Sequence, residues 1–230
     1  MALANMNALS FFNTLYFPKK LIHHYRRGVL LEGISGKELD KFAQTYCYLV
    51  KKFSYASGGK PLLLKNPANT ARLSFLKEQF PDAKFVHIVR NPYEVYASMQ
   101  KLWRRLFAAF SLQDHSQIDT HPHTLEIYES LTQRFLEQHT RIPEKDFIEI
   151  RFEELEREPV EQITRIYDRF DLAGKEAALE KIQTYASTLS GYRRSNYTLP
   201  QPTIDEIGSR WGFALDHWDY QLPDSISPEA

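Results

Sequence analysis

The stretch "KFVHIVRNPYEVYASM" (residues 84–99) constrains the fold more than any other part of the chain. It begins with a run rich in β-branched and aromatic residues, which is typical of a buried strand. A helix start follows, because Asn91 suits the N-cap, Pro92 suits the first helical position, and an acidic residue falls in the first turn. We therefore predict a strand over residues 84–89 that leads directly into a helix over residues 91–110.

Short apolar runs alternate with helical patterns on both sides of this stretch. Alternation of this kind predicts an α/β fold with a parallel sheet flanked by helices. We expect residues 1–230 to form a single domain, the "HPH" at 121–123 to lie in a loop, and the aromatic tail after about residue 190 to pack back onto the body. The expected strands cover residues 61–65, 84–89 and 147–152, and the expected helices cover residues 70–80, 91–110, 124–140 and 159–172.

Parallel sheets bind ligands beyond the carboxyl ends of their strands, and basic residues stand at these ends. Arg90 precedes a helix N-terminus, where free N–H groups, the helix dipole and a guanidinium together favour a phosphate, and Ser98 could add a hydroxyl. An ion pair between Arg90 and Glu94 is an equally good interpretation. Lys65 ends the first expected strand, and a solvated lysine is the simpler reading of that residue.

The composition excludes several classes of protein. Twenty-nine basic and 29 acidic residues cancel, whereas a nucleic-acid binder usually has a basic excess. Cys47 is the single cysteine, which excludes an intrachain disulfide and fits a reducing compartment. No apolar run approaches the roughly 18 residues of a membrane span. We therefore expect a cytoplasmic protein with no nucleic-acid partner and no membrane span.

Residues 60–103, from "KPLLLKNP" through "FPDAKFVHIVRNP" to Trp103, resemble the sulfotransferases that use 3′-phosphoadenosine 5′-phosphosulfate (PAPS). The likeness is greatest to the carbohydrate and tyrosylprotein branch and its bacterial relatives. The segments "FIEIRFEELEREP", "SGYRRSNYTLP" and "WGFALDHWDYQLP" are similar to later parts of the family pattern. The resemblance implies a parallel sheet like that of the P-loop nucleotide-binding proteins.

The resemblance also implies a function for each candidate residue. Arg90 and Ser98 match the residues that hold the 3′-phosphate of PAPS, and Arg193 falls where relatives approach the same phosphate from the C-terminal side. Lys65 matches the lysine beside the sulfuryl group in transfer. PAPS would be the donor, a hydroxyl or amine on a small molecule or carbohydrate the acceptor, and no metal would be required. The sequence identifies neither the acceptor nor the oligomeric state.

The chain departs from the family pattern in two places. Phe152 stands where the family usually has a tyrosine whose hydroxyl lies near the nucleotide. The first strand and the P-R-S-G-T-T loop, which binds the 5′-phosphosulfate in relatives, are not found, and the catalytic base is not identified. We therefore keep an alternative, a truncated or degenerate family member that binds nucleotide or a partner without turnover.

The histidines give no strong signal of their own. His23 and His24 are adjacent and lack carboxylate or cysteine partners at the spacing of a zinc site. His87 lies in a strand pattern and fits a hydrogen-bonded core residue better than a base. His121 or His123 could replace the missing base if their loop approaches the sheet.

Overall fold

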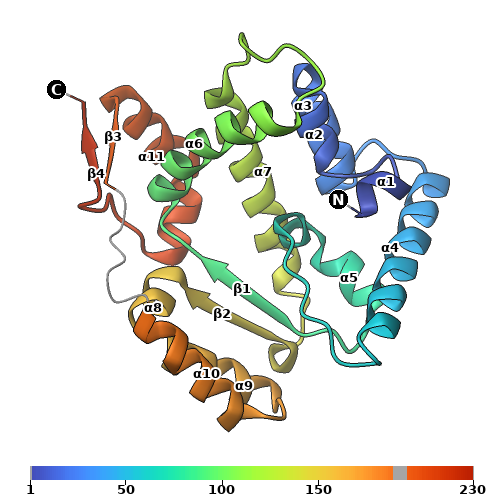
Figure 1. The fold of residues 1–230 in the computed structure, drawn as a ribbon. Helices are drawn as coiled ribbons and strands as arrows, with labels where there is room; N and C mark the ends of the chain where they lie inside the picture. The colour runs from blue at the N-terminus through green and yellow to red at the C-terminus, as the bar shows by residue number, and fades with distance from the viewer. Residues whose placement is uncertain (1, 189–195, 230) are drawn as a thin grey trace. The chain divides into compact units, whose positions relative to one another are not determined.

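The computed structural model describes residues 2–188 and 196–229, which fall into two compact units. The first unit comprises residues 1–81 and 99–140, and the second comprises residues 82–98 and 141–230. Figure 1 shows the elements of both units along the chain.

The first unit is helical in its described residues. Its core contains two clusters of buried side chains, one around Trp103 and Phe107 and the other around Tyr25 and Val29. Its elements are α1 (Ala2–Met6), α2 (Phe12–Tyr16), η1 (Pro18–Lys20), α3 (Leu21–Tyr25), η2 (Arg26–Leu30), α4 (Gly36–Ala56), η3 (Pro67–Arg72), α5 (Leu73–Gln79), the part of α6 (Pro92–Phe110) from Met99 onward, and α7 (Thr120–His139).

The second unit is built on two parallel strands, β1 (Phe85–Val89) and β2 (Phe147–Arg151). They lie side by side in Figure 1, and His87 pairs with Glu149 in their register. The prediction of an α/β fold with a parallel sheet is therefore confirmed. The remaining elements are the start of α6, η4 (Glu144–Asp146), α8 (Phe152–Arg157), α9 (Pro159–Phe170), α10 (Lys175–Thr188), β3 (Tyr197–Leu199), α11 (Gln201–Trp218) and β4 (Ile226–Pro228).

The turn from β1 into α6 forms as the sequence predicts. Asn91 accepts a hydrogen bond at its Oδ1 from the backbone N of Tyr93, at 3.0 Å, which is the expected N-cap contact. Pro92 follows as the first helical residue. The short connection leaves Arg90 directly at the carboxyl end of β1.

Two local predictions are wrong. Residues 61–65 form no strand, because within the described residues they have no hydrogen-bonded neighbour, and Leu63 is 95% exposed. The "HPH" at 121–123 is not a loop but the first turn of α7. The Asp119 side chain accepts from the backbone N of His121 at 2.9 Å and begins the helix earlier, and proline is tolerated in a first helical turn.

The C-terminal part packs on its own unit as expected, although α11 itself was not predicted. Trp211 is fully buried, and Trp218 and Tyr220 are also buried. Trp211 makes an edge contact with Tyr96 of α6, with ring centroids 6.1 Å apart. The tail therefore forms part of the core around the β1–α6 turn.

Candidate functional site

Arg90 is held at the carboxyl end of β1 by two neighbouring side chains. Its Nε donates to Oε2 of Glu94 at 2.9 Å, and its guanidinium lies 4.6 Å from the ring centroid of Phe152. Its side chain is 28% exposed, and neither Nη group has a hydrogen-bond partner among the residues that the structure describes. The guanidinium is thus fixed on one edge and one face, which leaves the Nη edge for an anion.

Glu94 is the buried partner in this arrangement. Its side chain is 3% exposed, and its second oxygen, Oε1, accepts a hydrogen bond from the Ser225 hydroxyl at 2.6 Å. A buried carboxylate needs partners of this kind, because an unpaired buried charge is costly. The predicted ion pair between Arg90 and Glu94 is therefore present, and it leaves the Nη edge without a partner among the residues that the structure describes.

A second carboxylate, Glu153, ties the C-terminal segment to the same turn. Its Oε1 accepts from the backbone N of Asn91 at 3.0 Å, and its Oε2 accepts from the hydroxyl of Tyr220 at 2.7 Å. The Asn91 side chain also donates to the backbone oxygen of Gln221, at 2.8 Å. One N–H at the start of α6 is therefore already used by a protein carboxylate and is not available to a ligand.

Ser98 lies two turns into α6, eight residues after Arg90 and four after Glu94. Residues spaced by four share one side of a helix, so Ser98 continues the side that carries Glu94. The residue is half-buried, and no other described residue forms a hydrogen bond with its hydroxyl. These properties suit a hydroxyl that contacts a ligand.

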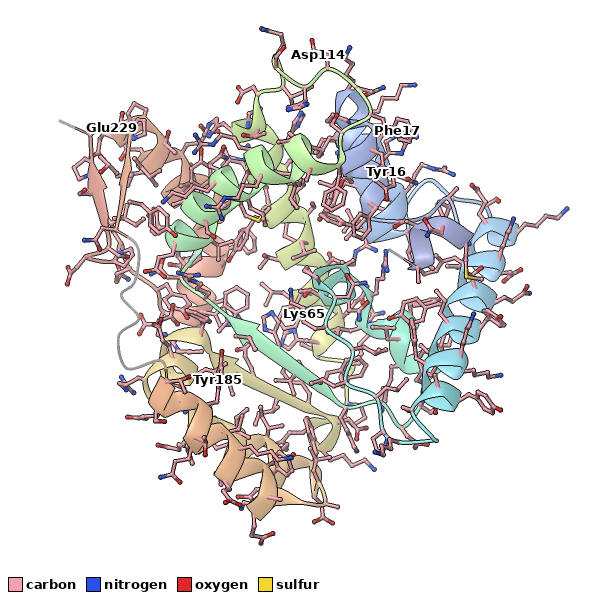
Figure 2. The ribbon with its side chains drawn as sticks, viewed as in Figure 1. Tyr16, Phe17, Lys65, Asp114, Tyr185 and Glu229 are labelled. Carbon is pink, nitrogen blue, oxygen red and sulfur yellow. The ribbon has the colours of Figure 1, made fainter. Side chains whose placement is uncertain are left out.

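Lys65 belongs to the first unit, whereas Arg90 and Ser98 belong to the second. Figure 2 labels it on the segment between α4 and η3, where the residue is exposed. The next residue, Asn66, accepts at its Oδ1 from the backbone N of Ala68 at 3.1 Å and caps η3. Arg193 lies outside the described residues.

His87 forms a hydrogen-bonded cluster on the sheet, in agreement with the core interpretation. Its Nδ1 lies 2.8 Å from Oε2 of Glu149, and Oε1 of that carboxylate accepts from Nε1 of Trp218 at 2.9 Å. Burial alone would raise the pKa of the Glu149 carboxyl, but the hydrogen bond and charge of His87 and the Trp218 hydrogen bond outweigh burial and lower that pKa.

Several contacts at this site could not be predicted from the sequence. Phe152 was noted only for the hydroxyl that it lacks, yet its ring supports the Arg90 guanidinium. Ser225 and Tyr220 reach the turn from far along the chain, and no local pattern marks them. A serine and a tyrosine after a tryptophan-rich helix are common surface residues, so only tertiary structure identifies them.

The described residues contain no group of three or more metal-ligating side chains. The rings of His23 and His24 lie 5.3 Å apart and edge to face. Residues 2–188 and 196–229 also contain no helix that combines the length and the hydrophobicity of a membrane span.

Comparison with known proteins gives consistent matches. The profile described as "Sulfotransferase family" matches residues 21–176, which is more than half of the chain. The omega-hydroxy-beta-dihydromenaquinone-9 sulfotransferase Stf3, from Mycobacterium bovis and Mycobacterium tuberculosis, is 29% identical over 216 residues, which cover 94% of this chain and 54% of Stf3. The crystal structure of sulfotransferase STF9 from Mycobacterium avium has a TM-score of 0.68 at 18% identity.

The structural match covers 86% of this chain and 50% of STF9, and it shows the shared fold. The chain therefore spans about half the length of the relatives that it matches. The family profile includes β1, β2 and the Arg90 turn. This chain belongs to the sulfotransferase family.

Proposed function

We propose that this chain binds PAPS through its 3′-phosphate and takes part in sulfuryl transfer to a hydroxyl. The observation that carries the proposal is the Arg90 guanidinium, held at the carboxyl end of β1 by Glu94 and Phe152 with its Nη edge unpaired among the described residues. A planar guanidinium can bind phosphate with two parallel hydrogen bonds. The half-buried Ser98 hydroxyl would supply a further donor to the same phosphate.

The transfer would be an in-line displacement at sulfur. The acceptor oxygen attacks the sulfuryl group, the bond between sulfur and the 5′-phosphate oxygen breaks, and 3′,5′-ADP leaves. The acceptor gives up its proton to a base, which we do not assign. Lys65 would neutralise negative charge on the sulfuryl oxygens, because catalysis of this type depends on positioning and charge stabilisation. Arg193 would reinforce the 3′-phosphate contact, and no metal is assigned a role.

For the acceptor we propose an alcohol carried by an apolar molecule. The support is the similarity to Stf3, whose name describes an omega-hydroxylated menaquinone as its acceptor. An assay with sulfur-labelled PAPS and a bacterial lipid extract tests this proposal. Label that moves into the organic phase supports it, and label that moves only into water-soluble sugars or peptides overturns it.

Calorimetry with the intact chain tests the donor site. We expect 3′,5′-ADP to bind at least tenfold more tightly than 5′-AMP, because only the former carries the phosphate for Arg90, and charged hydrogen bonds contribute about 1.5–3 kcal/mol each. Arg90→Ala should abolish this preference. Arg165→Ala is the control, since Arg165 lies on α9 in a surface ion pair with Glu154. Equal affinity of the intact chain for both nucleotides would refute the donor site.

A further inference from the structure

The outer side of α4 carries lysines and tyrosines in one continuous row. The row follows helical spacings of three and four residues, so its members share one side of the helix. Every member is exposed. We call this row the Lys/Tyr face, and it consists of Lys37, Lys41, Gln44, Tyr48, Lys51, Lys52 and Tyr55.

The opposite side of α4 packs within the first unit and fixes the rotation of the helix. Phe42 is fully buried, with its ring centroid 5.4 Å from that of Phe75, and Tyr46 lies 6.2 Å from the ring of Phe80. The α4 N-terminus is fixed as well, by the reciprocal capping contacts of Ser35 and Glu38. These contacts fix the orientation of α4, so the Lys/Tyr face points toward solvent.

Charge along the chain is strongly segregated at this face. The whole chain has no net charge at pH 7, yet no acidic residue occurs between Asp40 and Glu78. Asp40 is exposed and, three residues after Lys37 and four before Gln44, lies on the same side of the helix. None of the four lysines forms an ion pair with a residue that the structure describes. The face thus carries four lysines and one carboxylate, Asp40, on a protein with no net charge.

The two tyrosines make the face amphipathic. Tyr55 is 89% exposed and Tyr48 is 53% exposed. Tyrosine combines an apolar ring with a polar hydroxyl and is favoured at membrane–water interfaces, where lysine stems can also bury their methylenes. From Lys37 to Tyr55 the row is about 27 Å long on a straight helix, which suits a planar surface.

We propose that the Lys/Tyr face docks in the plane of an anionic phospholipid bilayer. The lysines would neutralise lipid phosphates, and the tyrosine rings would enter the headgroup region. Lysine without arginine favours lipid over nucleic acid, because arginine is preferred for bidentate recognition of nucleic-acid phosphates and bases. This inference stands independently of the proposed sulfuryl transfer, although it would hold the enzyme near a lipid-borne acceptor.

Flotation of the intact chain with phosphatidylcholine vesicles, prepared with and without phosphatidylglycerol, tests the proposal. We expect flotation only with the anionic vesicles, and loss of flotation as salt is raised. Lys51→Glu with Lys52→Glu should weaken binding by at least about tenfold, since each interfacial lysine contributes about fivefold. The matched control is Lys145→Glu with Lys181→Glu, which changes the same charge at two exposed lysines of the second unit.

Tyr48→Ser with Tyr55→Ser should also weaken flotation while leaving the melting temperature unchanged, because both rings are exposed.

Three outcomes would overturn the proposal. The intact chain could fail to float with anionic vesicles at low salt. The Lys51/Lys52 variant could float as well as the control. Poly(U) RNA could bind more tightly than vesicles of equal phosphate concentration, which would assign the face to a nucleic acid. Nucleotide binding, measured in parallel, tests the donor site separately.

Discussion

Arg90 depends on a buried neighbour for its orientation. Glu94 fixes the Nε edge at 2.9 Å and is in turn held by Ser225, while Phe152 supports one face of the guanidinium. A free arginine would lose side-chain entropy when it binds phosphate, and this arrangement removes part of that cost before the ligand arrives. Glu94 therefore acts as a positioning residue for the proposed phosphate contact.

Glu94→Gln should weaken 3′,5′-ADP binding by about tenfold, which corresponds to roughly half of a charged hydrogen bond. Glutamine keeps the shape but removes the charge that attracts the Arg90 Nε. Ser225→Ala is the milder comparison, because it leaves the Arg90–Glu94 contact in place. Calorimetry gives the affinity, and the melting temperature without ligand separates orientation from stability. Unchanged or tighter binding by Glu94→Gln would show that Arg90 needs no positioning.

In our proposal Lys65 acts in the transfer step and does not contribute to the affinity for the nucleotide. Lys65→Ala should lower kcat by about 10²–10³, the usual effect of removing one group that stabilises transition-state charge. Affinity for 3′,5′-ADP should change by less than about twofold, because that product has no sulfuryl group. Lys60→Ala, an exposed lysine five residues earlier, should leave both quantities unchanged. A Lys65→Ala variant that retains full kcat would remove Lys65 from the mechanism.

At the scale of elements, the close packing of η2 depends on a glycine. A Cβ at Gly28 would lie 2.7 Å from the backbone oxygen of Ser10 and 3.1 Å from its backbone nitrogen, and backbone atoms cannot move cheaply. The flanking Val29 and Leu30 are buried in the first unit. This contact brings two N-terminal segments together without an intervening side chain.

Gly28→Ala should therefore destabilise the protein by about 1–3 kcal/mol, the usual cost of overpacking. Chemical denaturation monitored by far-UV circular dichroism measures the change. Gly36→Ala provides the control, because a Cβ there meets nothing within 4 Å at the first turn of α4. Alanine at that position should be neutral or slightly stabilising. Equal stability of the two variants would mean that the Ser10 segment moves away freely.

The pairing of β1 with β2 should make stability depend on pH through Glu149. Its folded-state pKa is lowered, so its contribution is present above the unfolded value of about 4.5 and is lost as pH falls through the folded value below that. Melting temperatures between pH 6 and about pH 3 should fall less steeply for Glu149→Gln than for the wild type. Glu180→Gln, on the exposed side of α10, should follow the wild type. Parallel curves for Glu149→Gln and the wild type would contradict this assignment.

Elements with local signals were predictable, and elements that depend on distant partners were not. The Asn91 cap and the apolar run of β1 lie within a few residues, and both were predicted correctly. Residues 61–65 have a strand-like composition, but a strand also requires a neighbour. In α11, Gly208 weakens the helical pattern, yet a Cβ there would lie only 3.1 Å from the Tyr93 hydroxyl, which is a tertiary contact.

The same distinction applies to the candidate site. Arg90 and Ser98 follow from one short motif, and the structure places both in the second unit at the start of α6. Ser225 lies 131 positions from Glu94, so no sequence pattern could reveal their contact. Two interpretations of Arg90 followed from the sequence, namely a phosphate contact and an ion pair with Glu94. The structure shows the ion pair at the Nε edge, and the phosphate contact stays a proposal for the Nη edge of the same guanidinium.

The solubility of the whole molecule depends on its net charge and on its exposed apolar side chains. Acidic and basic residues are equal in number, so the net charge is near zero at pH 7. Leu63 is 95% exposed, and Val86 and Ile88 of β1 are 38% and 48% exposed. Exposed apolar groups promote association, and a net charge near zero offers no electrostatic repulsion against it. We therefore expect solubility to be lowest near pH 7.

Solubility should rise on mild acidification. Acidification to about pH 5.5 adds protons to the chain and raises its net charge above zero, because that pH lies below the sequence pI of about 7.1. That pH lies above the window in which Glu149 begins to lose its contribution. Precipitation by polyethylene glycol at pH 5.5, 7 and 8.5 measures the effect. The Lys145→Glu, Lys181→Glu variant, with a net charge lower by about 4, should shift the minimum below pH 7. A minimum that stays at the same pH in that variant would show that apolar contacts, and not net charge, control association.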